Sequence, residues 1–224
     1  MNILAIDTAA ALCAACIYDT EAGTERARVV LDLGKGHAEH VMAVVENALE
    51  QAGFSFNDIG AIAVSVGPGS FTGIRVGVSA ARGFALALKI PAMGITTLEA
   101  LAAQTRASFP GRQVLCAVGR TEPFAMGLFD PSGKILDGPR LAGMEDLVNA
   151  ALTGRPVLAG DVADLVAENA GGDFEKGPLA ATADILFYAR VAASRPLGQE
   201  KPKPLYLRAP DAKPQSGFAL PLKG

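Results

Sequence analysis

A glycine-rich turn followed by a helix with little polar surface constrains this chain most. The segment GPGSFTGIRVGVSAARGFALALK spans residues 67–89, and the apolar run at residues 61–66 is typical of a buried strand. Its first three residues favour a tight turn, because glycine adopts positive φ without strain and proline fixes its own φ. The segment therefore predicts a strand, a turn and a helix, with Ser70 or Thr72 as the helix N-cap.

The composition of this helix predicts burial on more than one side. Arg75, Ser79 and Arg82 fall on one narrow stripe, and most other positions are apolar or small. A glycine inside a helix costs about 1 kcal/mol relative to alanine, so Gly77 and Gly83 indicate close approach of another backbone. Burial inside the chain's own fold and a face that receives a partner subunit both explain the pattern. The residues alone do not decide between these two interpretations.

The turn does not match a nucleotide-binding loop. A P-loop needs Gly-x4-Gly-Lys-Ser/Thr, but Thr72 stands at the second glycine position and no lysine follows. The dinucleotide fingerprint Gly-x-Gly-x-x-Gly fails because Gly73 comes one residue late. Since a helix N-terminus attracts anions, phosphate binding stays an alternative. A structural turn is the favoured interpretation.

Composition narrows the class of protein. The 224 residues are 50% hydrophobic and 19% charged, which is typical of a globular chain with a large core. A net charge of −3 disfavours a chain that grips nucleic acid alone, because such binding depends on clustered Lys and Arg. We find no apolar run long enough to span a membrane and no basic region before the apolar N-terminal residues, so we expect a cytoplasmic protein.

The three cysteines, Cys13, Cys16 and Cys116, indicate a reducing compartment, because they are few and odd in number. Cys13 and Cys16 have the spacing of a redox or metal motif. They fall in an expected strand, however, where residues three apart point to opposite faces. We therefore favour core cysteines.

The order of elements predicts an α/β fold made of two related subdomains, the second abbreviated. Three strands in a meander followed by helix, strand and helix favour the ribonuclease-H-like fold of actin, Hsp70 and sugar kinases. The second half repeats the strand-then-helix order in shorter form. The expected divisions are residues 1–108 for the N-terminal subdomain with partner-binding helices, 109–210 for the smaller subdomain and 211–224 for a mobile tail.

Asp7 ends the first expected strand, where that superfamily binds nucleotide. The superfamily hairpin Asp-x-Gly-Thr wraps ATP phosphates, whereas this chain has Asp-Thr-Ala-Ala from Asp7. An alanine Cβ stands where phosphate needs bare backbone. We interpret Asp7 as a hydrogen-bonding residue at a strand end, with a nucleotide or metal ligand as the alternative.

His37 and His40, the only histidines, lie at the start of a helix expected between Gly36 and Gly53. Residues three apart share a helix face and can ligate one metal ion. Their spacing differs from His-Glu-x-x-His, and no third ligand is evident nearby. A role at the helix start or at an interface is favoured over metal binding.

Five strings together carry a family resemblance. They are ILAIDTA at residues 3–9, GH at 36–37, GPGSFTGIR at 67–75, GITTL at 94–98 and PLYLR at 204–208. In this order they resemble the bacterial TsaB (YeaZ) family of tRNA threonylcarbamoyladenosine synthesis. The catalytic paralogue TsaD is longer and carries His-x-x-x-His, so the chain resembles the non-catalytic partner.

The resemblance implies a scaffold role. In this family the N-terminal helices pack against those of the catalytic subunit or of a second copy. The chain would support a TsaD-like subunit, with a small TsaE-like ATPase, in transferring threonylcarbamoyl from threonylcarbamoyl-AMP to the adenosine 3′ of the anticodon. It would reach tRNA only through the complex.

The same resemblance places the chemistry in the partner subunits. ATP and metal would be held there, and this chain would have no catalytic residue, cofactor or metal of its own. The residues that we expect at the partner interface are His37, Val41, Val45, Gly73, Ile74, Gly77, Val78, Ala80, Ala81 and Phe84.

Two points stand against a simple transfer of the family's properties. Residues 118–124 depart from the family's usual Asp-Ala-Arg and Gly-Glu-Val-Tyr pattern, which only Arg120 and Glu122 echo. Asp7 and the two histidines also support a competing hypothesis, a small enzyme of the same fold such as an ATP-dependent kinase or a metalloprotease. A plain homodimeric binding module is the third hypothesis.

Overall fold

The computed structural model describes residues 1–198 and 200–207, which form two sheets and their covering helices. Arg208 and the tail expected at residues 211–224 lie outside these ranges. The strands are β1 (Asn2–Asp7), β2 (Leu12–Asp19), β3 (Thr24–Asp32), β4 (Ile59–Ser65), β5 (Ala92–Ile95), β6 (Val114–Val118), β7 (Phe124–Phe129), β8 (Ile135–Ala142) and β9 (Val157–Ala159). The helices are α1 (His37–Ala52), α2 (Phe71–Leu88), α3 (Thr97–Ser108), α4 (Met144–Leu152), α5 (Ala163–Ala170) and α6 (Ile185–Ala193), with a 3₁₀ turn at Phe56–Asp58.

The two sheets share one strand order, which shows the expected relation between the halves. The first sheet runs β3-β2-β1-β4-β5 and the second β8-β7-β6-β9. In each, an antiparallel three-strand meander is joined by a parallel strand beside its first member. The second sheet has no counterpart of β5 among the described residues. This is the predicted ribonuclease-H-like α/β fold, with the second half abbreviated.

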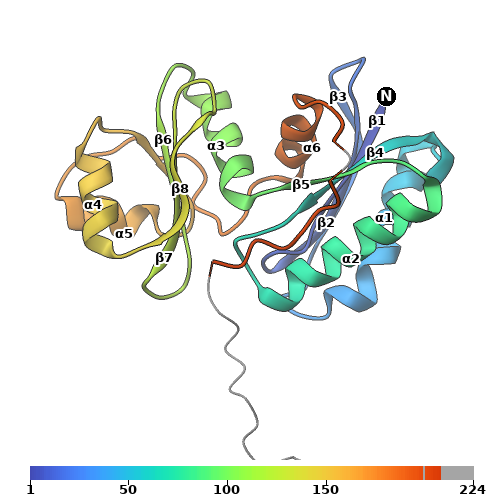
Figure 1. Cartoon of the computed structure of the whole chain (residues 1–224), viewed down its shortest axis with the longest axis horizontal. Coiled ribbons are helices and arrows are strands. Elements are labelled where there is room, and N and C mark those ends of the chain that lie inside the picture. The colour runs from blue at the N-terminus through green and yellow to red at the C-terminus, as the bar shows by residue number, and fades with distance from the viewer. Residues whose placement is uncertain (199, 208–224) are drawn as a thin grey trace, which may run out of the picture.

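Helices and sheets alternate in five layers (Figure 1). Helices α1 and α2 cover one face of the first sheet, and α6 packs on its other face. Helix α3 packs beside α6 and against β6 of the second sheet, whose far side is covered by α4 and α5. The contacts therefore cross the division expected after residue 108, because α3 lies on the second sheet and α6 on the first.

Helix ends follow local sequence signals. Ser70 is the N-cap of α2, and its hydroxyl accepts a hydrogen bond from the Gly73 amide at 3.2 Å. Gly53 ends α1 in the left-handed conformation at φ 70°, as expected of a C-terminal glycine. Helix α3 is capped by Thr96, and the Glu99 carboxylate accepts a hydrogen bond from the Thr96 amide at 2.9 Å.

The cysteines are core residues, as predicted. Cys13 packs with the residues under α1 and α2, and Cys16 packs on the opposite face of the sheet, toward α6. Cys116 is also buried, and all three thiols are free. Burial raises the pKa of Cys13 to about 11, which keeps its thiol protonated and unreactive at neutral pH.

Candidate partner interface

The loop after β1 lies directly under the start of α2. The Thr8 hydroxyl donates a hydrogen bond to the Gly73 carbonyl at 2.7 Å, and the Ser70 amide donates one to the Ala9 carbonyl at 2.6 Å. A Cβ on Gly73 would stand 2.0 Å from the Thr8 carbonyl oxygen, and one on Gly69 would stand 2.3 Å from that of Ala9. These glycines are therefore required by close approach of the chain's own backbone.

The end of β1 does not fit a nucleotide phosphate. Asp7, Thr8 and Ala9 are at most 2% exposed. The amide of Ser70, which would face a phosphate at this helix start, is already bonded to Ala9. The chain's own loop and turn therefore pack against each other at this end of β1.

Asp7 is a buried structural acid. Burial raises its pKa to about 6, although the Ala9 amide donates a hydrogen bond to Oδ1 at 2.9 Å and favours the charged form. Burial also raises the pKa of the neighbouring Tyr188 hydroxyl, and the Asp7 charge adds to this effect. His37 Nε2 is buried without a hydrogen-bond partner in the described structure.

The two histidines at the start of α1 have different surroundings. His40 Nδ1 is 3.0 Å from the Gly36 carbonyl oxygen, while His37, the first residue of the helix, is buried. Within residues 1–198 and 200–207, no three His, Cys, Asp or Glu side chains gather at a spacing that suits a metal ion.

The residues expected at the partner interface lie mostly inside the chain. Ala80 and Phe84 keep partial exposure, and the Phe84 ring stacks on Phe56 at a centroid distance of 5.3 Å. The others pack between the helices and the first sheet. The buried ones are His37, Val41, Val45, Gly73, Ile74, Gly77, Val78 and Ala81.

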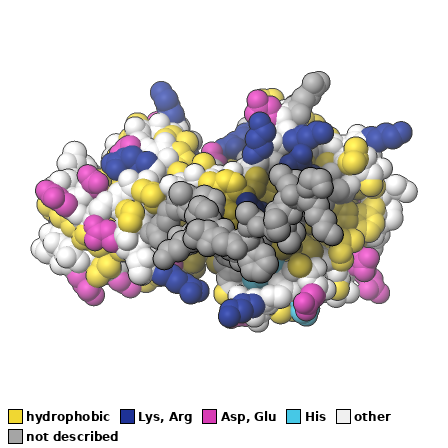
Figure 2. All heavy atoms as spheres, turned by 60° about the horizontal axis from the view of Figure 1, so that its bottom comes forward, with side chains coloured by type: hydrophobic (Ala, Val, Ile, Leu, Met, Phe, Trp, Pro, Cys, Tyr) yellow, Lys and Arg dark blue, Asp and Glu magenta, His cyan; other side chains and the backbone are white. Residues whose placement is uncertain are grey.

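Other residues form the outward surface of α2, which we call the outer face of α2. Leu86 is the most exposed large apolar side chain among the described residues, at 80%. Figure 2 shows hydrophobic side chains spread over the half of the molecule that carries α1 and α2, with Lys and Arg at its margins. The outer face of α2 consists of Phe71, Thr72, Arg75, Ser79, Arg82, Gly83, Leu86 and Ala87.

Within residues 1–198 and 200–207, the outer face of α2 combines apolar side chains with Arg75 and Arg82, and all of its residues are exposed. Within the part of the chain that the structure describes, α2 is the one helix long and apolar enough to cross a membrane, a criterion that core helices also meet. Only 28% of it is buried, which sets it apart from a core helix. A Cβ on Gly83 would meet no atom within 4 Å, so nothing in the described chain explains this glycine.

Arg75 stands at one end of the outer face in an aromatic stack. Its guanidinium carbon lies 3.8 Å from the Phe71 ring centroid and 5.6 Å from that of Tyr206. Its Nε donates a hydrogen bond to the Tyr206 hydroxyl at 2.8 Å, and the two rings are 5.1 Å apart. Sequence reasoning missed this cluster, because Arg75 and Tyr206 are 131 positions apart.

The two helices carry opposite charge. Helix α2 and its C-cap contain Arg75, Arg82 and Lys89 and no acidic residue. Helix α1 contains Glu39, Glu46 and Glu50, all exposed, and no Lys or Arg. A surface that covers both helices therefore meets a basic, apolar strip beside an acidic strip.

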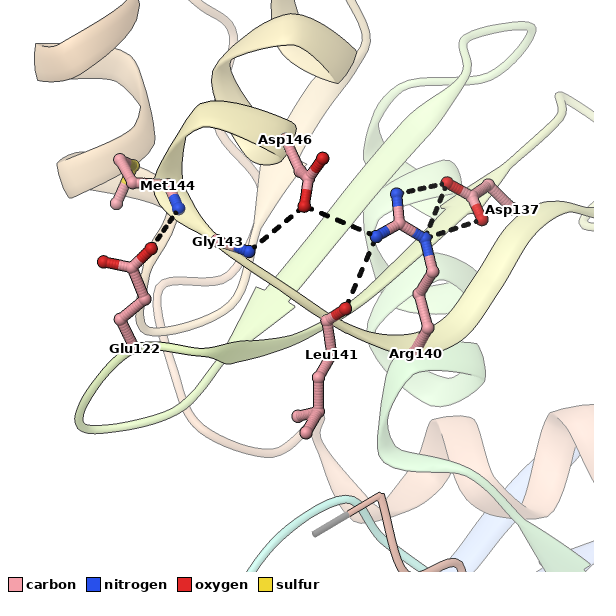
Figure 3. Close-up of polar contacts among 7 residues, drawn as sticks. All are labelled: Glu122, Asp137, Arg140, Leu141, Gly143, Met144 and Asp146. Carbon is pink, nitrogen blue, oxygen red and sulfur yellow. Dashed lines mark hydrogen bonds and ion pairs between the residues drawn. The ribbon is translucent and has the colours of Figure 1, made fainter.

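The loop at residues 118–124 is held by carboxylates (Figure 3). Glu122 Oε1 accepts a hydrogen bond from the Met144 amide at the start of α4, at 2.8 Å. Arg140 lies nearby between Asp137 and Asp146, at 2.9 and 3.7 Å. Glu122 therefore fastens the divergent loop to α4, a role that the sequence pattern did not reveal.

Comparison with known sequences gives one family. The family model described as TsaD, tRNA N6-adenosine threonylcarbamoyltransferase, matches residues 32–194. The tRNA threonylcarbamoyladenosine biosynthesis protein TsaB of Escherichia coli is 36% identical over 118 residues, which are 53% of this chain and 50% of that protein. The match thus spans about half the length of this relative. An uncharacterized protein of Mycobacterium tuberculosis is 31% identical over 232 residues, 95% of this chain and 94% of its own.

Comparison with solved structures supports the fold. YeaZ from Pseudomonas aeruginosa superposes with a TM-score of 0.68 and 22% identity, over 86% of this chain and 91% of that chain. The expected α/β architecture with two related halves is confirmed by this likeness.

Proposed function

The chain belongs to the TsaB (YeaZ) family, and on that premise we propose that it is a non-catalytic scaffold subunit in tRNA N6-threonylcarbamoyladenosine biosynthesis. In this proposal it supports a TsaD-like subunit, which transfers threonylcarbamoyl from threonylcarbamoyl-AMP to the adenosine 3′ of the anticodon. A small TsaE-like ATPase completes the complex in the cytoplasm. ATP and metal are held by the partners, and tRNA is reached through the complex.

The exposed outer face of α2 carries the proposal. Leu86 is 80% exposed, so most of its apolar surface is in contact with water. This exposure costs free energy, and a partner that covers Leu86 removes the cost. Exposed Gly83 and Ser79 allow another helix to approach closely. When the catalytic partner is absent, a second copy of the chain covers the same surface.

The burial of the residues at the end of β1 supports a role in which no reaction takes place there. Asp7 is 2% exposed, so a substrate cannot reach it unless the loop moves away from α2. Arg75 and Arg82 are the charged side chains of α2, and both are exposed on its outer face.

A reconstitution tests the proposal. The purified chain is mixed with the TsaD-like and TsaE-like proteins of the same organism, complex formation is followed by sedimentation, and tRNA threonylcarbamoylation is measured with and without the chain. We expect a stable complex and modification that depends on the chain, while the chain alone neither binds ATP nor modifies tRNA. ATP turnover by the isolated chain would instead support the small-enzyme hypothesis.

A further inference from the structure

We propose that Arg75 is the charged anchor of this interface and that its guanidinium binds a carboxylate of the partner protein. The proposal rests on the scaffold function and adds the chemistry of the partner surface. That surface presents an Asp or Glu side chain at the edge of an apolar strip that covers the outer face of α2.

The aromatic contacts of Arg75 involve one face and the Nε edge of its guanidinium. The Phe71 ring lies against the guanidinium, the Tyr206 ring lies farther away beside Phe71, and Nε donates its hydrogen bond to the Tyr206 hydroxyl. The ion pairs of residues 1–198 and 200–207 do not include Arg75. Within those residues, no ion pair involves its two terminal nitrogens, whose outward N–H donors form the fork that suits a carboxylate.

The tertiary structure fixes this arginine before any partner arrives. The Leu205 amide donates a hydrogen bond to the Val66 carbonyl at the end of β4, at 2.8 Å, and Leu205 packs against the core under α1 and α2. This places the Tyr206 hydroxyl beside Arg75, near the start of α2. A side chain held in this way loses little conformational entropy on binding, which favours an anchor role over that of a freely moving surface arginine.

The surrounding charges select a protein rather than a nucleic acid. Helix α2 offers only cations, so the surface that covers it is acidic where it meets Arg75. The neighbouring α1 exposes Glu39, Glu46 and Glu50, which repel a phosphate backbone. Leu86 is exposed on the same face and is stabilised by contact with apolar groups, which a protein surface provides.

The test compares variants in affinity for the purified TsaD-like protein, by calorimetry at low and high salt. Arg75→Ala is expected to weaken the complex about 30-fold, and Arg75→Lys, which keeps the charge and loses the fork, about 10-fold. Tyr206→Phe keeps the ring and loses the hydroxyl, and is expected to weaken binding about threefold.

The matched control is Arg26→Ala, since Arg26 is an exposed arginine on β3 that lies 5.8 Å from the Phe54 ring. Its expected change is below about twofold.

Each outcome is decisive. If Arg75→Ala and Arg75→Lys bind as tightly as Arg26→Ala while the unaltered complex forms, the anchor is wrong and the scaffold function stands. If the unaltered chain does not bind the TsaD-like protein, the proposed function itself fails. If the Arg75 variants keep protein affinity but lower the affinity of the complex for tRNA, the anion is a phosphate and the proposal is overturned. Thermal unfolding identifies a misfolded variant, in which case Arg75→Lys decides.

Discussion

The hydroxyl of Thr8 donates a hydrogen bond to the carbonyl of Gly73 at 2.7 Å, across 65 positions of sequence. This contact joins the end of β1 to the first turn of α2. A Cβ on Gly77 would stand 2.5 Å from the same hydroxyl oxygen. The glycines on the inner side of α2 thus serve the chain's own fold.

Gly73→Ala is therefore expected to destabilise the protein. Its Cβ would stand 2.0 Å from the Thr8 carbonyl oxygen, and backbone cannot move aside cheaply, so we expect a loss above about 3 kcal/mol in the free energy of unfolding. Gly83→Ala is the matched control in the same helix, where the new methyl group meets open space. It should stabilise the isolated chain by about 1 kcal/mol. Urea unfolding of both variants measures the difference, and equal effects would contradict this account.

Asp7→Asn is expected to stabilise the protein at neutral and basic pH. The pKa of Asp7 is about 6 in the folded state and 3.8 in an unperturbed carboxyl, so the folded protein binds the proton more tightly. The unaltered protein therefore gains stability as pH falls from 6 to 4, and the charged form costs up to about 3 kcal/mol above that window. The amide keeps an oxygen to accept the Ala9 hydrogen bond.

Urea unfolding between pH 4 and pH 8 measures this effect. The advantage of Asp7→Asn should be largest at pH 8 and vanish near pH 4. The control is Asp58→Asn, because bonds from the Ser55 amide and hydroxyl lower the pKa of the exposed Asp58. That group stabilises the fold when charged, so its replacement should act in the opposite direction at neutral pH. An advantage of Asp7→Asn that does not change with pH would rule out the buried charge as its cause.

Local signals in the sequence predicted much of the fold. Ser70 and Gly53 mark helix ends because capping depends on a few neighbouring residues. Cys13 and Cys16 lie on opposite faces of the sheet, as predicted, because the alternation of side chains along a strand alone decides the face on which each residue lies. The repeated meander order followed from the succession of short apolar runs.

The orientation of α2 was beyond the sequence for a physical reason. Apolar or small residues fill most of this helix outside the stripe of Arg75, Ser79 and Arg82, so periodicity shows which side is exposed but not which of the other sides meets the sheet. The inward side carries Gly73 and Gly77, which looked suited to a partner helix but accommodate Thr8. The Arg75–Tyr206 bond depends on where the C-terminal segment returns, and no local pattern encodes that.

Glu122→Ala is expected to loosen the second half of the molecule. It removes the acceptor for the Met144 amide and leaves the first turn of α4 without that bond, which costs about 1 kcal/mol (Figure 3). Glu122→Gln keeps an acceptor oxygen and should cost less. Arg140→Ala is the comparison within the same cluster, since its ion pairs are about half exposed and contribute at most about 1 kcal/mol.

Hydrogen exchange at the Met144 amide distinguishes these variants. Glu122→Ala should speed exchange at the start of α4, whereas Arg140→Ala should leave it nearly unchanged. Equal protection of that amide in Glu122→Ala and the unaltered protein would show that the loop and α4 are held together by other contacts.

Leu86→Glu is expected to separate folding from assembly. Leu86 is 80% exposed, so the isolated chain should change its unfolding free energy by less than about 0.5 kcal/mol. In the complex, the carboxylate would be buried against an apolar surface without a partner, and affinity for the TsaD-like protein should fall at least about 30-fold.

The matched control is Leu152→Glu, at the end of α4, where the leucine is 51% exposed and far from α2 in the layered fold. Sedimentation with the purified partner measures both variants. Unchanged assembly of Leu86→Glu, or an equal loss with Leu152→Glu, would remove the outer face of α2 as the docking surface.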